Sequence, residues 1–176
     1  MSLKIQLLEA SFEKIKPQSQ EFSQSFYRNL FLEYPELEQL FANTNLVEQQ
    51  RKLILSLALI VDNLRSPETL DLALKSLGAY HVKTGTVKEH YPLLGDILLA
   101  TFADFLGANW TEELAQSWRE GYETISNLML EGAKNPEAYL HEELTFYEWL
   151  ELYGESSPYL IESIGDMTDF KYRKPV

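Results

Sequence analysis

Histidine is scarce in this chain, and one of its three histidines lies where it could bind a metal. His81 continues a stripe of apolar residues at helical spacing, formed by Leu70, Leu74 and Leu77. The stripe directs the imidazole toward either a protein core or a cofactor. A neutral imidazole is a common metal ligand, but a lone histidine on an apolar face is more often a hydrogen-bonded core residue. The residue type and spacing leave both interpretations open.

Two polar residues stand on other predicted apolar helix faces. Tyr27 follows Phe26, and Gln49 shares a stripe with Leu53. A phenol O–H and an amide N–H are both hydrogen-bond donors, so these side chains could hold an atom with partial negative charge. Tyr27 could equally be a packing residue of an amphipathic helix. A shift of one residue in the helix face would give the role of Gln49 to Gln50.

Composition excludes several classes of protein. The chain has 176 residues, with 27 acidic and 15 basic side chains and a formal net charge of -12. Such a charge argues against nucleic acid or an anionic membrane as a partner. The absence of cysteine excludes disulfides, thiolate metal sites and a thioether anchor for a cofactor. The N-terminus shows no signal peptide and no window reaches the ~18 uncharged apolar residues of a membrane helix, so a cytoplasmic location is expected.

The elements that would position these residues are helices. Apolar residues recur at three and four along most of the chain, and no alternating strand pattern is present, so the fold class is all-α. Asn45, Ser66 and Thr111 are candidate N-caps. Pro92 is expected to open a helix that ends near Gly107. We expect helices over about 3–14, 17–34, 35–41, 46–64, 67–81, 92–107 and 111–132.

Six strings in this order resemble the globins, and within them the bacterial single-domain haemoglobins and the globin half of flavohaemoglobins. The strings are SFYRNLF (25–31), YPELEQLF (34–41), VEQQRKL (47–53), AYHVKTG (79–85), HYPLLG (90–95) and W-x3-Y (118–122). Each string is weak alone, but their shared order is fairly specific. The resemblance covers roughly residues 1–132.

The resemblance implies a globin-like 3-on-3 helical fold that holds haem b, with His81 as the ligand of the iron. It places Tyr27 and Gln49 on the gas-binding side, where both would donate to a bound ligand. Leu53 would form the apolar ceiling there, and Phe41 would wedge against the haem. Further cofactor contacts are implied for Leu77, Tyr91 and Leu98. His90 is the rival ligand, expected at the cofactor edge or in solvent, and His141 is expected to be exposed.

The chain departs from the flavohaemoglobin pattern near His81. That pattern ties the iron-ligating histidine to a Tyr and a Glu. Tyr91 matches the Tyr, but the Glu position falls on Ala133 if Trp118 sets the register, and Glu131 lies about 200° around the helix from it. A strongly electron-donating His81 is therefore not expected. Gln49 also lacks the Pro that often follows it in that pattern.

Two domains are predicted: a globin domain over 1–133 and an acidic, aromatic-rich helical extension over 134–176. The extension is expected either to pack on the globin domain as one helix from Pro136 to about Tyr153 and a shorter one after Pro158, or to form an interface for a homodimer or another partner.

Three functions follow as hypotheses. The first is reversible binding of dioxygen, and of nitric oxide or carbon monoxide, with oxygen scavenging or nitric oxide dioxygenation through a separate reductase, because the sequence shows no flavin or nicotinamide motif. The second is a haem-based gas sensor that signals through the extension. The third is a haemless globin-fold interaction protein.

Overall fold

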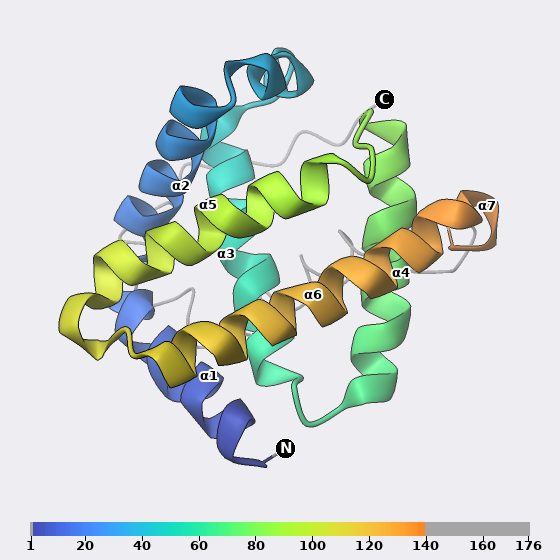
Figure 1. Ribbon diagram of the computed structural model, residues 1–176. Coiled ribbons are helices and arrows are strands. Elements are labelled where there is room, and N and C mark those ends of the chain that lie inside the picture. The colour runs from blue at the N-terminus through green and yellow to red at the C-terminus, as the bar shows by residue number, and fades with distance from the viewer. Residues whose placement is uncertain (1, 140–176) are drawn as a thin grey trace, which may run out of the picture.

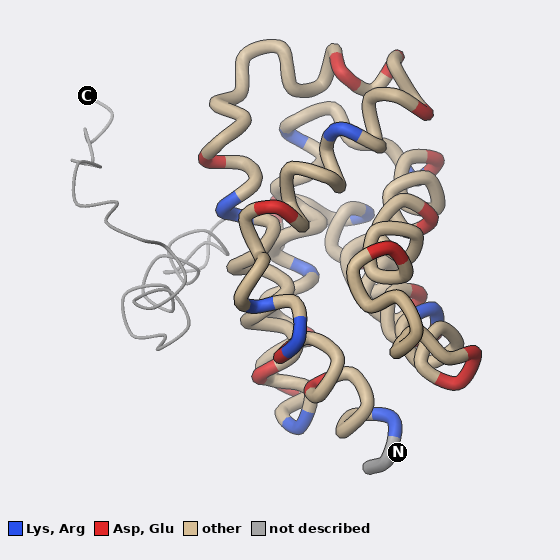
Figure 2. Tube along the Cα trace, turned by 90° about the vertical axis from the view of Figure 1, so that its left-hand side faces the viewer, with Lys and Arg blue, Asp and Glu red and all other residues tan. Residues whose placement is uncertain are grey.

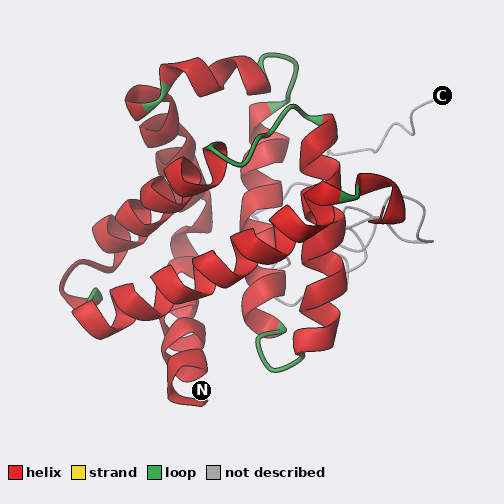
Figure 3. Cartoon of the chain, turned by 45° about the vertical axis from the view of Figure 1, so that its right-hand side comes forward, coloured by secondary structure: helices red, strands yellow, loops and turns green. Residues whose placement is uncertain are grey.

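The computed structural model of the protein describes residues 2–139, and these residues contain helices and short connections but no strand (Figure 3). The all-α prediction is confirmed. In chain order the helices are α1 (Ser2–Ile15), α2 (Ser19–Glu33), α3 (Leu46–Asp62), α4 (Pro67–Lys83), α5 (His90–Leu106), α6 (Glu112–Lys134) and α7 (Pro136–Tyr139), with 3₁₀ turns η1 (Lys16–Gln18), η2 (Pro35–Phe41) and η3 (Gly107–Asn109).

The helices cross one another in two layers, with α5 and α6 running across α3 and α4 (Figure 1). The buried apolar side chains form two clusters. The large cluster joins α1, α2, α3, α5 and the first half of α6, with Phe22, Leu30 and Phe102 fully buried in it. The small cluster joins α3 to α4 and the second half of α6, around Leu59, Leu74 and Met129. Helices α3 and α6 contribute to both clusters and so connect them.

The helix ends test the predicted caps. Asn45 accepts hydrogen bonds from the backbone N–H groups of Val47 and Glu48, and Thr111 accepts from that of Leu114. Both predictions are confirmed. Ser66 was expected to cap α4, but its side chain makes no capping bond. The expected start of α5 at Pro92 is also wrong, because the helix begins at His90 and Pro92 lies in its first turn.

Two glycines bring α4 and α6 into backbone contact. A Cβ atom added to Gly78 would lie 1.8 Å from the Met129 carbonyl oxygen, and one added to Gly132 would lie 1.9 Å from that of Lys75. No side chain fits at either crossing point, so only glycine permits this approach. The contact fixes α4, which carries His81, against α6.

The stretch His90–Asn109 is more apolar than expected, because the sequence analysis predicted no segment that could span a membrane. By length and composition, His90–Asn109 could cross a membrane. Its inward face, including Ile97, Leu98 and Phe102, is buried in the large cluster. A core helix has the same composition, so this stretch is weak evidence for a membrane segment.

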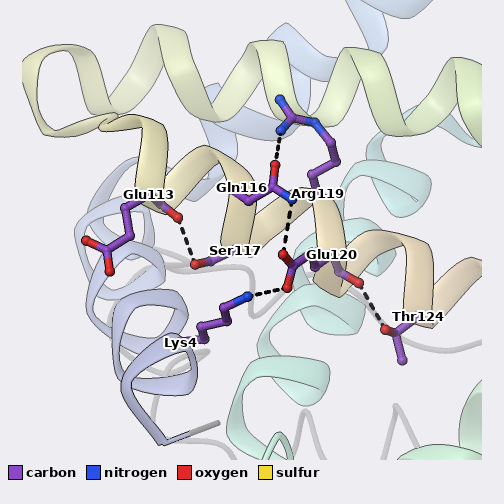
Figure 4. Close-up of polar contacts among 7 residues, drawn as sticks. All are labelled: Lys4, Glu113, Gln116, Ser117, Arg119, Glu120 and Thr124. Carbon is purple, nitrogen blue, oxygen red and sulfur yellow. Dashed lines mark hydrogen bonds and ion pairs between the residues drawn. The ribbon is translucent and has the colours of Figure 1, made fainter.

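Charged side chains lie on the outer faces of the helices (Figure 2). On α6, Glu120 pairs with Lys4 of α1 and accepts a hydrogen bond from Gln116 at 3.1 Å (Figure 4). These contacts are exposed, so each adds little to stability. Below them, the Trp118 indole N–H donates to the buried Ser11 hydroxyl at 3.0 Å, which ties α6 to α1 in the core.

The predicted boundary between residues 133 and 134 falls inside α6, one residue before its end. Helix α7 then begins at Pro136, as expected, and contacts α4. The rest of the extension, and His141 with it, lies outside the described residues. The two-domain division therefore stays a prediction.

Candidate functional site

A cavity of about 430 Å³ lies among α2, η2, α3, α4, α5 and α6. Its volume is within the range of pockets for small molecules and cofactors. The eight residues singled out from the sequence all line it, from five different elements: Tyr27, Phe41, Gln49, Leu53, Leu77, His81, Tyr91 and Leu98. Helix packing thus brings together side chains that lie up to 71 positions apart in the sequence.

One wall of the cavity carries Tyr27 within a group of aromatic rings. Its ring centroid lies 5.0 Å from that of Phe26 and 5.6 Å from that of Phe41, both edge-on. Burial raises the pKa of Tyr27 well above its ordinary value of 10, and a side-chain hydrogen bond with Gln49 opposes this shift only in part. The hydroxyl therefore keeps its proton and remains a donor at any physiological pH.

Gln49 lies one turn into α3, after the cap at Asn45. It lines the cavity, whereas Gln50 is not among the lining residues. The hydrogen bond between the Gln49 and Tyr27 side chains places two polar groups at one point of a largely apolar wall. The choice of Gln49 over Gln50, which the sequence left open, follows from this geometry.

A different wall carries His81, in the last turn of α4. Burial lowers the pKa of His81 from 6.5 to about 4, so the imidazole is neutral and has a lone pair for a metal. Its Nδ1 atom is buried and has no hydrogen-bond partner. The ring of Tyr91 meets it edge-on, at a centroid distance of 6.4 Å and an angle of 74°. The hydrogen bond expected of a core histidine is therefore absent at Nδ1.

The cavity rim is polar, and most of its residues were not predicted from the sequence. Lys52, Thr84 and Thr86 line it, and so does His90, whose Nδ1 accepts a hydrogen bond from the Val87 N–H at 3.3 Å. Threonines in a connecting segment give no periodic signal, so the sequence offered no means of selecting them. On α6, Ile125 and Met129 also line the cavity. They continue the three-and-four spacing of Trp118 and Tyr122, so the sequence pattern could have predicted them.

Within residues 2–139 no group of three or more acidic or histidine side chains is placed to hold a metal ion alone. A single neutral imidazole beside a roomy apolar cavity instead suits a metal that a macrocycle already holds. The sequence pattern of the Globin family matches residues 24–129, which include His81 and every other residue that lines the cavity. The chain belongs to the globin family.

Relatives of this globin include longer proteins. A flavohemoprotein of Rhizobium meliloti is 32% identical over 108 residues, which are 60% of this chain but only 27% of that protein. An uncharacterized globin-like protein of Aquifex aeolicus is 30% identical over 129 residues and matched over 88% of its length. This chain thus spans about a quarter of the flavohemoprotein and most of the globin-like protein.

A solved structure shares the fold. An engineered carbene transferase, described as a putative nitric oxide dioxygenase from Rhodothermus marinus, superposes with a TM-score of 0.70 at 29% identity. The match covers 81% of this globin and 99% of that chain. The predicted globin-like 3-on-3 architecture is confirmed.

The residues present fit the haem that globins hold. The cavity walls are mainly apolar and suit a flat macrocycle, and the polar rim with Lys52, Thr84 and Thr86 suits its carboxylates. Because Nδ1 of His81 has no accessible surface, Nε2 is the nitrogen that would meet iron.

Proposed function

We propose that this globin binds haem b through His81 and takes up a diatomic gas beside Tyr27 and Gln49. Haem iron supplies an open coordination position at which dioxygen, nitric oxide or carbon monoxide can bind. The single observation that supports the proposal is one cavity with a neutral imidazole on one wall and two hydrogen-bonding groups on another.

The chain's own residues set how long a gas stays. A ligand with partial negative charge can accept a hydrogen bond from the Tyr27 hydroxyl or the Gln49 amide. Each bond of this kind contributes about 1.5–3 kcal/mol. A contribution of this size slows release by roughly ten- to a hundredfold. Slow release suits oxygen scavenging, sensing or reaction better than transport.

An absorption spectrum of the purified protein tests the proposal, recorded as isolated, after reduction, and after addition of carbon monoxide. A strong Soret band that shifts with carbon monoxide is expected, and His81→Ala should abolish or alter it. His90→Ala is the matched control, since His90 lies at the cavity rim and should leave the band unchanged. A Soret band unaffected by His81→Ala, or none after reconstitution with haem, would contradict the proposal.

Nitric oxide dioxygenation is a second candidate. It is favoured by the flavohemoprotein relatives and by the neighbour described as a putative nitric oxide dioxygenase. Repeated turnover needs electrons, and we propose that a separate reductase supplies them. Consumption of nitric oxide by the oxygenated protein, with an added reductant, would be measured for Gln49→Leu and Gln50→Leu. Only the Gln49 variant should change the rate, because only Gln49 lines the cavity.

We further propose that the protein lies in the cytoplasm, that it can assemble into a homodimer, and that it can signal to a partner through residues 134–176. A haemless interaction module is the alternative that the spectrum would reveal.

A further inference from the structure

Three aromatic rings, those of Trp118, Phe102 and Trp110, form a stack that begins at the cavity wall. Trp118 lines the cavity, and its ring centroid lies 4.1 Å from that of Phe102 at an interplanar angle of 27°. The fully buried Phe102 ring lies parallel to that of Trp110, with centroids 6.2 Å apart and an angle of 2°. Offset parallel rings at these separations pack directly on each other. The aromatic stack therefore connects the cavity to Trp110.

Trp110 is the outer end of the aromatic stack. It lies in the connection between η3 and α6, directly after residues 107–109, which are exposed. Its own side chain is half-buried against the large cluster. Trp110 thus keeps contact with water, whereas Trp118 is only 4% exposed.

The two indoles differ in what their N–H groups can do after the loss of an electron. The Trp118 N–H donates to the Ser11 hydroxyl at 3.0 Å, which itself donates to the Leu8 carbonyl oxygen at 2.9 Å. Neither group is basic enough to accept a proton, so an oxidised Trp118 would stay a buried cation, which is strongly disfavoured. At Trp110, water can solvate the charge and take up the proton. An electron should therefore move from Trp110 to an oxidised Trp118.

Two tyrosines of the cavity wall, Tyr27 and Tyr122, are less suited to lose an electron. An oxidised phenol releases its proton and so needs a base beside it. The Tyr122 hydroxyl donates to the Tyr91 carbonyl oxygen at 2.7 Å, and the Tyr27 side chain is hydrogen bonded to the neutral amide of Gln49. Neither partner is a base, so the indoles are the better electron source.

We propose that the aromatic stack is an electron relay that carries oxidising equivalents from the cavity to Trp110 at the surface. The oxidant is hydrogen peroxide reacting at bound haem, so the inference rests on the proposed haem site. The phenylalanine ring between the indoles is too hard to oxidise and serves as the medium for transfer. A small-molecule reductant in the solvent can then return the electron to Trp110.

The reaction balances without such a reductant if Trp110 itself is consumed. Hydrogen peroxide takes up two electrons and two protons, its O–O bond breaks, and two water molecules form. Both electrons leave Trp110 in turn through Trp118. Trp110 loses one ring hydrogen as a proton and bonds to the hydroxyl of a water molecule, which gives up the second proton. The product is hydroxytryptophan at position 110.

Peptide mass spectrometry of the haem-loaded full chain after exposure to hydrogen peroxide tests the relay. Trp149→Phe is used as the background, so that Trp110 and Trp118 are the only indoles left. We expect hydroxylation of Trp110, prevented by added ascorbate. The further change Trp118→Phe should abolish this product, down to the level of haem-free protein. A full yield at Trp110 without Trp118, or hydroxylation of Trp118 in place of Trp110, would overturn the inference.

Phe102→Leu and Phe22→Leu form a matched pair of variants. Both phenylalanines are fully buried, and their ring centroids lie 4.8 Å apart, but Phe22 is not part of the aromatic stack. Phe102→Leu should lose most of the Trp110 product, and Phe22→Leu should keep it. Equal yields in two folded, haem-loaded variants would contradict the relay.

A measurement on the unaltered protein keeps the inference testable if these variants do not fold. Electron paramagnetic resonance of samples frozen soon after mixing with hydrogen peroxide detects the radical. We expect a spectrum that narrows when the protein is made with ring-deuterated tryptophan. A radical on tyrosine alone, with no change on this labelling, would overturn the inference. A protein without a Soret band would instead defeat the proposed function, so the two failures are distinguished.

Discussion

At the residue scale, burial decides which protonation state each site residue holds. Tyr27 stays a hydrogen-bond donor because its pKa is raised, and His81 stays neutral because its pKa is lowered to about 4. The sequence could select both residues, because an aromatic pair and an apolar stripe are visible in it. It could not choose between Gln49 and Gln50 or reveal the unpartnered Nδ1, because both depend on how neighbouring helices rotate and approach.

Tyr27→Phe should speed dioxygen release by about ten- to a hundredfold, because it removes one donor but keeps the ring. The packing against Phe26 and Phe41 should survive, so the fold is expected to be unchanged. Stopped-flow displacement of dioxygen measures the release rate. Tyr34→Phe is the control, since Tyr34 packs against the large cluster but does not line the cavity. Equal rates in the two variants would remove Tyr27 from the gas site.

At the element scale, the position of each helix depends on a few local features. The sequence predicted the helices because their apolar spacing is regular. It could not rank the three cap candidates, since Asn45, Ser66 and Thr111 are all common at that position. The backbone explains the outcome: Asn45 and Thr111 are extended, with ψ of 108° and 160°, whereas Ser66 has ψ of 68° and its hydroxyl makes no bond to the first turn.

Asn45→Ala should lower the free energy of unfolding by about 0.5–2 kcal/mol, because two N–H groups of α3 lose their acceptor. Ser66→Ala should change it by less than about 0.5 kcal/mol, because no cap is lost. Chemical denaturation followed by circular dichroism compares the two. Equal losses would mean that Ser66 caps α4 in solution.

Gly78→Ala and Gly132→Ala should each destabilise the fold by about 1–3 kcal/mol or more, because the added Cβ would overlap backbone atoms. Gly121 on α6 offers a matched control. A Cβ there meets nothing closer than Leu8 Cδ1 at 3.8 Å. Gly121→Ala should therefore stabilise the helix, by up to about 1 kcal/mol. The denaturant midpoint of each of the three variants measures its stability. An unchanged midpoint for Gly78→Ala would show that α4 can move away from α6.

At the scale of the whole molecule, three of the four tyrosines that line the cavity, Tyr27, Tyr91 and Tyr122, respond to pH in the same direction. Burial raises the pKa of Tyr91 to about 12 and raises those of Tyr27 and Tyr122 further. In the unfolded chain a tyrosine ionises near pH 10. The unfolded state therefore loses protons above pH 10 while the folded state keeps them. Their contribution to stability is fully present below pH 10 and is lost as the pH rises.

The free energy of unfolding should accordingly be flat with respect to these groups up to about pH 9. It should then fall between pH 10 and 12, by at most about 1.4 kcal/mol per pH unit for each tyrosine. Urea denaturation at a series of pH values measures the slope. Tyr27→Phe should reduce the slope by about a third, and a slope identical to that of the unaltered protein would contradict the buried, protonated hydroxyl.

The division of the core into two clusters has a consequence for how the molecule opens. The small cluster holds α4 through α3 and α6, and the cavity lies where the two clusters would otherwise meet. With the cavity empty, backbone amides of α4 are protected from exchange with solvent deuterium mainly by the small cluster and by the glycine crossing. Filling the cavity would join the clusters, so that α4 and α2 exchange in a single cooperative event. The site that captures a gas would then also decide whether this protein unfolds in one step or in two.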